Sequence, residues 1–244
     1  MTLKEIIQKM TNQFGYHLIK IDDKTIADYQ RCYPYTSYTY SPWFSEWFQK
    51  IYDKIKNHTK VTEDRCYVIY ILAKQCLNVN GDFAECGVYK GGTSFLISSI
   101  IDDSSLKKQL HLFDTFKGMP KYADDDPSSH TQDDFNDTSE ETVKSFLQDF
   151  QFIEFYPGLI PLTFKNITEK TFSFVHIDVD LYKSVDDCCK FFYSKMNPGG
   201  VMLFDDYGFK GYQLAARKAV DEFFKDKPEN PLVLQNGQCL VIKL

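Results

Sequence analysis

The sequence lacks the features that would assign it to a membrane, secreted or nucleic-acid-binding class. No apolar run approaches the ~20 residues of a membrane-spanning helix, and the N-terminal segment MTLKEIIQKM lacks the hydrophobic stretch of a secretory signal. The seven cysteines include no C-x-x-C pair, which indicates reduced thiols in a cytoplasmic protein. A net charge of −6 argues against nucleic acid or an anionic membrane as the main partner.

The 43% hydrophobic fraction is sufficient for one large α/β domain or two small ones. Residues 1–80 predict a helical extension, with helices at 3–10, 43–55 and 61–77 and a Tyr-rich loop before Trp43. Thr62 is a plausible N-cap of the third helix. This extension is expected to shape a substrate pocket or a contact between copies in a homo-oligomer.

From residue 81 onward, short apolar strands alternate with helical stretches. Strands are predicted at 82–88, 110–116, 151–158, 172–180, 199–208, 231–235 and 238–244, and helices at 92–101, 184–196 and 213–224. Such alternation is typical of a mostly parallel sheet with helices on both faces. The last two strands have no helix between them, and Asn236–Gly237 is a hairpin signal, so the sheet is expected to end in an antiparallel strand. Residues 81–244 therefore predict one Rossmann-like domain.

The turn after the first predicted strand, ECGVYKGG, contains Gly87, Gly91 and Gly92, which would allow a ligand to approach the backbone. The same turn also fits a strand-to-helix connection without a ligand. Glu85 favours a site, because a carboxylate in a buried strand needs a partner. Asp114, at the end of the second strand, is placed to hold a ribose diol of NAD or S-adenosylmethionine. The absence of G-x-G-x-x-G disfavours the dinucleotide.

Carboxylates also follow two later strands, at Asp178 and Asp180 and at the adjacent pair Asp205 and Asp206. If these strands are neighbours, Asp178, Asp205 and Asp206 converge, and their repulsion calls for a hard divalent cation such as Mg²⁺. A less specific interpretation is that some of these acids cap helices or pair with Arg217 or Lys218.

Five ordered motifs resemble the macrocin O-methyltransferase (TylF) family: GDFAECGVYKGGTS, LFDTFKGMP, DDFNDTSEETV, IDVDLYKS and NPGGVMLFDDYG. The similarity runs from about Val61 to Phe224. It implies a class I methyltransferase fold, S-adenosylmethionine as donor, and Mg²⁺ held by Asp178, Asp205 and Asp206. The predicted cofactor site around the two turns comprises Glu85, Gly87, Tyr89, Gly91, Thr93, Ser94, Asp114, Thr115 and Phe116, with Arg65 from the preceding helix.

The sequence departs from this family at Phe209, where some relatives carry a His that can act as general base. The base then falls to Asp178, Asp180 or a metal-bound water. An acidic segment at about 119–140 is expected to form a lid. Together these features predict methyl transfer to a hydroxyl of a small sugar-containing molecule. The alternatives are a non-sugar hydroxyl such as a catechol, a non-catalytic domain that retains the fold, and an NAD-dependent enzyme.

Overall fold

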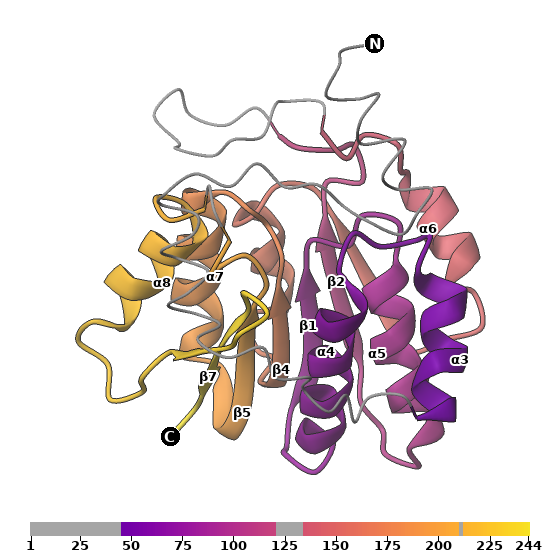
Figure 1. The fold of residues 1–244 in the computed structure, drawn as a ribbon, viewed down its shortest axis with the longest axis horizontal. Coiled ribbons are helices and arrows are strands. Elements are labelled where there is room, and N and C mark those ends of the chain that lie inside the picture. The colour runs from indigo at the N-terminus through magenta and orange to yellow at the C-terminus, as the bar shows by residue number, and fades with distance from the viewer. Residues whose placement is uncertain (1–44, 121–133, 210–211) are drawn as a thin grey trace, which may run out of the picture. The chain divides into compact units, whose positions relative to one another are not determined.

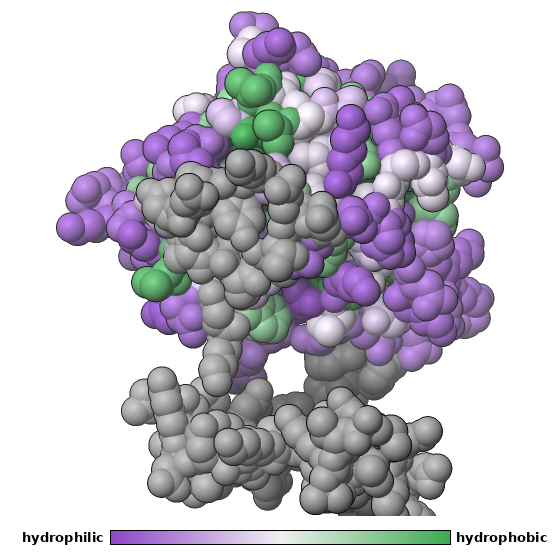
Figure 2. Space-filling view, turned by 90° about the horizontal axis from the view of Figure 1, so that it is seen from above, coloured by the Kyte–Doolittle hydropathy of each residue, from purple (hydrophilic) through white to green (hydrophobic). Residues whose placement is uncertain are grey.

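The computed structural model describes residues 45–120, 134–209 and 212–244. They belong to the second of two units into which the chain divides, Met1–Pro42 and Trp43–Leu244. The predicted helix at 3–10 and the Tyr-rich loop lie outside the described residues. Within them, no helix is long and apolar enough to span a membrane, and hydrophilic side chains cover most of the described surface in Figure 2.

Helices and strands alternate along the chain as the sequence pattern predicts. In order they are α3 (Glu46–Ile55), α4 (Glu63–Cys76), β1 (Asp82–Cys86), α5 (Gly92–Asp103), β2 (Leu110–Asp114), α6 (Glu140–Phe146), β3 (Ile153–Pro157), the 3₁₀ helix η1 (Leu162–Ile167), β4 (Phe172–Ile177), α7 (Tyr182–Tyr193), β5 (Met196–Phe204), α8 (Ala216–Phe224), β6 (Leu232–Val233) and β7 (Cys239–Ile242).

The seven strands form one sheet in the order β3-β2-β1-β4-β5-β7-β6. The first five of these strands are parallel, whereas β7 is antiparallel to both β5 and β6. The predicted class of fold and the antiparallel end of the sheet are therefore confirmed. The strand order reverses between β1 and β4, which are neighbours in the centre of the sheet (Figure 1). In sheets of this kind, ligands bind at such a switch point, beyond the carboxyl ends of the strands.

Two apolar layers cover the sheet because alternate strand residues face opposite sides. On one face, Phe83 of β1 and Phe174 of β4 belong to a cluster with buried residues of α3, α4 and α5. On the other face, Ala84 and Val175 belong to a cluster with α7, α8 and η1. The helices α3 and α4 of the predicted N-terminal extension thus contribute to the core on this face of the sheet.

The acidic region contains a helix that the sequence pattern did not predict. Ser139 caps α6 by accepting a hydrogen bond from the Thr142 amide, and Glu140 and Glu141 occupy the first turn, where negative charge is favourable. Val143 is fully buried and lies against the Gly91 turn. Most of the predicted lid, 121–133, lies outside the described residues.

Gly87 allows the turn after β1 to lie directly against β4. Its φ is +89°, and a Cβ added there would meet the Asp178 carbonyl oxygen at 1.8 Å. The Asp178 amide in turn donates to the Cys86 carbonyl at 2.8 Å. The lack of a side chain at Gly87 therefore fixes where Asp178 leaves the sheet.

We expect Gly87→Ala to lower the free energy of unfolding by more than ~3 kcal/mol, because the new methyl group would collide with backbone. Gly199→Ala is a matched control, since Gly199 also has a positive φ, +83°, but its nearest atom would lie at 3.6 Å. The control should lose only about 1–2 kcal/mol from backbone strain. Urea unfolding of both variants measures the difference; equal losses would mean that the close contact at Gly87 is unimportant.

Candidate active site

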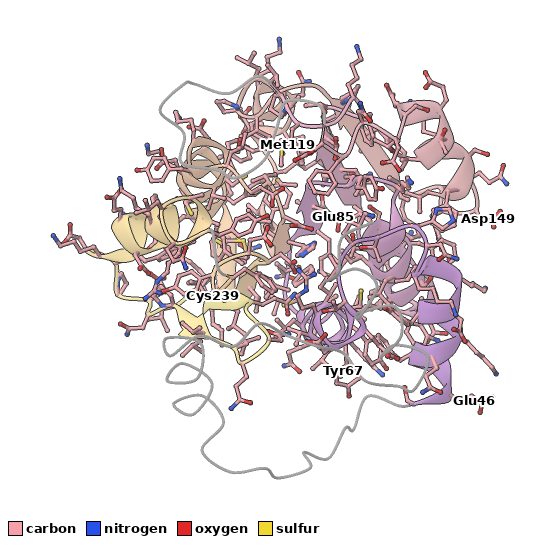
Figure 3. All side chains as sticks on the ribbon, turned by 45° about the horizontal axis from the view of Figure 1, so that its top comes forward. Glu46, Tyr67, Glu85, Met119, Asp149 and Cys239 are labelled. Carbon is pink, nitrogen blue, oxygen red and sulfur yellow. The ribbon has the colours of Figure 1, made fainter. Side chains whose placement is uncertain are left out.

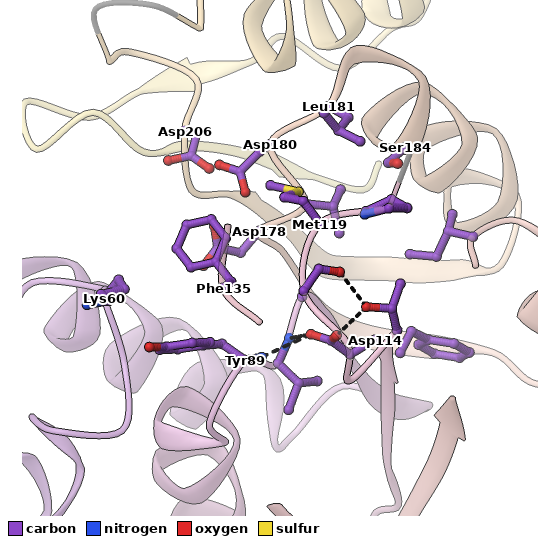
Figure 4. A pocket seen from close by; sticks show the side chains of 18 of the residues that line it. Lys60, Tyr89, Asp114, Met119, Phe135, Asp178, Asp180, Leu181, Ser184 and Asp206 are labelled. Atoms are coloured by element: carbon purple, nitrogen blue, oxygen red, sulfur yellow. Dashed lines mark hydrogen bonds between the residues drawn. The ribbon is translucent and has the colours of Figure 1, made fainter. Parts of the chain in front are cut away.

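A cavity opens at the carboxyl ends of β1, β2 and β4, where the strand order reverses. Its wall combines the turn after β1, the loop after β2, the segment before α4 and the acidic loop after β4 (Figure 4). The residues on this wall that the sequence analysis had selected are Arg65, Gly87, Tyr89, Thr93, Asp114, Thr115, Asp178, Asp180 and Asp206.

Asp114 holds the turn after β1 in place. One of its carboxylate oxygens accepts hydrogen bonds from the Val88 and Tyr89 amides at 2.7 and 2.9 Å. The other accepts from the Phe116 amide at 2.7 Å. Each carboxylate oxygen has two lone pairs; the first oxygen uses both on the turn, whereas the second keeps one, so Asp114 can hold the turn and still accept one hydrogen bond from a ligand in the cavity.

Asp178, Asp205 and Asp206 converge as the strand register predicts. Each offers a carboxylate oxygen, and the three oxygens lie within 4.8 Å of one another. Burial raises the pKa of Asp178 and of Asp206 well above the usual carboxyl range, and the neighbouring carboxylates raise both further. The cluster therefore repels itself when no cation is bound.

Asp205 differs from the other two because protein groups already neutralise it. It is fully buried and forms an ion pair with Arg65 of α4. Its other oxygen accepts from Gln238 Nε2 at 2.7 Å and lies 3.5 Å from His176 Nε2. Burial alone would raise the pKa of Asp205, but His176 and the charge of Arg65 outweigh it and lower the pKa.

His176 connects the acidic cluster to the turn after β1. Its Nδ1 lies 2.9 Å from Glu85 Oε1, and the second Glu85 oxygen accepts from the Ser94 hydroxyl. Although burial lowers the pKa of His176, its two acidic partners raise it to about 10. Glu85 is fully buried, and Figure 3 places it in the interior of the molecule. Glu85 is thus paired with His176, and Glu85 does not line the cavity.

One atom of the cluster has the environment expected for a metal ligand. Asp206 Oδ2 is buried and accepts no hydrogen bond within the described residues. An unsatisfied anionic oxygen in a protein interior is costly, and a hard cation with oxygen ligands would satisfy it. The residues present therefore fit Mg²⁺, with Asp206 and Asp178 on the cavity wall and Asp205 behind them.

Asp180 follows β4 after the chain has left the sheet. Its φ is +56°, so it does not continue the extended geometry of the strand. Its carboxylate contacts Asp206 and hydrogen-bonds to Tyr212, whose pKa is raised by burial and by this acidic neighbour. Figure 4 shows Asp178, Asp180 and Asp206 gathered at one end of the cavity.

Four of the predicted cofactor residues do not line the cavity. They are Glu85, Gly91, Ser94 and Phe116. Arg65 does reach the wall, but its guanidinium is bound to Asp205, Thr62 and the Lys60 carbonyl.

Sequence reasoning did not anticipate Gln238, Tyr212 or Lys60 at this site. Gln238 is fully buried although it follows a hairpin turn. No local pattern signals such contacts, because they depend on how distant segments pack.

The solved structures with similar folds are methyltransferases. The O-methyltransferase NovP matches with a TM-score of 0.65 and 23% identity, over 76% of this chain and 82% of that one. The calicheamicin methyltransferase CalS11 matches with a TM-score of 0.63 and 16% identity, over 92% of this chain and 94% of that one. The sheet thus has the methyltransferase fold.

The profile of the macrocin-O-methyltransferase (TylF) family matches residues 58–234, so the chain belongs to this family. It is 28% identical over 141 residues to the demethyldecarbamoylnovobiocin O-methyltransferase of Streptomyces niveus, and 27% identical over 158 residues to the mycinamicin III 3''-O-methyltransferase of Micromonospora griseorubida. These stretches cover 53% and 59% of this chain, but only 54% and 61% of the two relatives.

The contrast between Asp205 and Asp206 predicts opposite effects on stability. In the presence of a chelator, Asp205→Asn should lower the free energy of unfolding by about 3 kcal/mol or more, because Arg65 and His176 lose a buried counter-ion. Asp206→Asn, the matched isosteric control, removes one of the repelling charges and should leave stability unchanged or higher. Urea denaturation of both variants provides the measurement. A similar loss of unfolding free energy in both variants would contradict the conclusion that protein groups compensate the charge of Asp205 but not that of Asp206.

Proposed function

We propose that this protein is an Mg²⁺-dependent, S-adenosylmethionine-dependent O-methyltransferase that acts on a hydroxyl of a sugar, within a glycoside or a nucleotide sugar. The observation that carries the proposal is the buried, unpartnered oxygen of Asp206 in a trio of carboxylates. This trio adjoins a glycine turn and Asp114 at the switch point of a methyltransferase fold.

The names of related proteins support a sugar acceptor. The relative from Streptomyces olivaceus, 26% identical over 159 residues, is a 4'-O-methyltransferase of a rhamnosyl tetracenomycin. CalS11 is described as a TDP-rhamnose 3'-O-methyltransferase. The first acceptor is a glycoside and the second a nucleotide sugar, so both classes belong in the proposal.

In this function the two ends of the cavity have different tasks. Asp114 would accept a hydrogen bond from a ribose hydroxyl of the donor, and Gly87 would let the donor approach the backbone. Asp178 and Asp206, with Asp205 behind them, would hold Mg²⁺, which supplies Lewis acidity that lowers the pKa of the acceptor hydroxyl. Because both ends are fixed by the protein, they would hold the donor and the acceptor at a set distance and orientation.

Asp180 is the residue best placed to accept the proton of the acceptor hydroxyl. It lies on the cavity wall beside Asp206 and is hydrogen-bonded to Tyr212. The residue after the DDYG motif is Phe209, whose ring stacks against the Arg65 guanidinium at 4.9 Å and has no basic group. A carboxylate therefore takes the role that a His has in some members of the family.

Purified protein should transfer labelled methyl groups from S-adenosylmethionine to a deoxysugar glycoside or nucleotide sugar in a screen of such acceptors. A chelator should stop turnover and Mg²⁺ should restore it. Asp206→Asn should abolish turnover but retain the affinity for S-adenosylhomocysteine within about threefold, because Asp206 lies at the other end of the cavity from Asp114. Full turnover with chelator would refute the metal requirement, and transfer only to catechols would refute the sugar acceptor.

We further expect Asp180→Asn to retain binding of Mg²⁺ and S-adenosylhomocysteine while its turnover falls by ~10²-fold or more, the size of a general-base contribution. The pH–rate profile of the Asp180→Asn variant, measured at saturating Mg²⁺, should also lack the acidic limb of the wild-type profile. Asp178→Asn provides the comparison, since it should lose metal affinity as well as activity. A wild-type rate and pH profile for Asp180→Asn would show that the proton leaves by another route.

A further inference from the structure

One cation on the cavity wall has no counter-ion within the described residues. Lys60 lies just before α4, and its Nζ is 5.9 Å from the centre of the Tyr89 ring. Two neighbouring cations are neutralised, Arg65 by Asp205 and Lys90 by Asp137. No ion pair found in residues 45–120, 134–209 and 212–244 includes Lys60, so its charge is available to a ligand.

The backbone around Lys60 is fixed although its side chain is exposed. The Lys60 carbonyl accepts a hydrogen bond from Arg65 Nη2 at 3.0 Å. The next amide, of Val61, donates to Thr59 Oγ1 at 3.0 Å. The same Arg65 is anchored by buried Asp205. A rigid backbone thus presents a flexible cation to the cavity, beside Tyr89 and away from Leu181 and Ser184 (Figure 4).

The shape of S-adenosylmethionine indicates which of its groups would lie near Lys60. The sulfonium of S-adenosylmethionine carries three groups: the methyl, the ribose carbon and the aminocarboxypropyl arm. With the ribose at Asp114 and the methyl directed to Asp178 and Asp206, the third arm needs a further stretch of the wall. Thr59, Lys60, Val61, Tyr89 and Thr93 form one such stretch, beside the turn after β1.

We propose that Lys60 binds the carboxylate of the donor's aminocarboxypropyl arm; this inference rests on the proposed function. The arm ends in a carboxylate, which a Lys ammonium binds in a charge-assisted hydrogen bond. By contrast, four carboxylates line the rest of the cavity: Asp114, Asp178, Asp180 and Asp206.

Calorimetry with two ligands tests this assignment. The first is S-adenosylhomocysteine, and the second is its decarboxylated analogue, which differs only in lacking the carboxylate. Lys60→Met keeps the aliphatic stem over Tyr89 and removes the charge. It should weaken S-adenosylhomocysteine binding by about tenfold and leave binding of the analogue unchanged. Lys60→Arg should restore the affinity. Lys90→Met is the matched control, because Lys90 also lies over the Tyr89 ring but outside the cavity wall.

Three outcomes would overturn the proposal, and each has a different meaning. Equal weakening of both ligands by Lys60→Met would assign Lys60 to the packing of the turn. Unchanged affinity for both ligands, with a raised KM for a nucleotide-sugar acceptor, would place an acceptor phosphate at Lys60. Failure of the wild-type protein to bind either ligand would instead reject the proposed donor, and with it the basis of this inference.

Discussion

The buried charge of Asp205 is the interaction on which the rest of the site depends. A carboxylate with no exposure to water is unfavourable unless it is paired and hydrogen-bonded. Here the partners come from three distant parts of the chain: Arg65 from α4, His176 from β4 and Gln238 from the turn before β7. Satisfying one aspartate therefore joins helix α4, the centre of the sheet and its antiparallel end around the same point.

The three aspartates of the acidic cluster differ in how the protein compensates their charges. Asp205 is compensated by protein groups, and its pKa is lowered despite burial. Asp178 and Asp206 form no ion pair with Lys or Arg within the described residues, and burial together with the neighbouring carboxylates raises their pKa values. In this part of the chain, Arg65 therefore compensates Asp205 and not the two aspartates on the cavity wall. The cost of the uncompensated pair is the physical reason why a cation would bind at the cavity end of the cluster rather than within the core.

The sequence was sufficient to predict the parts of the structure that follow from local pattern. Alternation of strands and helices identified the fold, and the positions of Asp178, Asp205 and Asp206 at strand ends predicted their convergence, because β4 and β5 are parallel neighbours. The pairing of Arg65 with Asp205 spans 140 positions and has no local signature. Asp114 was predicted at a ligand site, but its bonds to the turn after β1 depend on the register of β1 with β2. The helix α6 was missed because its acidic composition resembles that of a solvated loop.

Backbone strain is concentrated on the cavity wall. Of the four non-glycine residues with positive φ in the described residues, Tyr89, Phe135 and Asp180 line the cavity. Such conformations cost about 1–2 kcal/mol each and persist only where the surroundings enforce them. Asp114 holds the Tyr89 amide, the Phe135 ring packs edge-on against Tyr89, and Asp180 is held by contacts with Asp206 and Tyr212. Because each strained residue is fixed by another residue of the wall, the shape of the cavity is set without a ligand. The same reasoning applies to Asp178 and Asp180, which are two residues apart: the left-handed conformation of Asp180 interrupts the extended geometry in which both side chains would point to the same face of the strand.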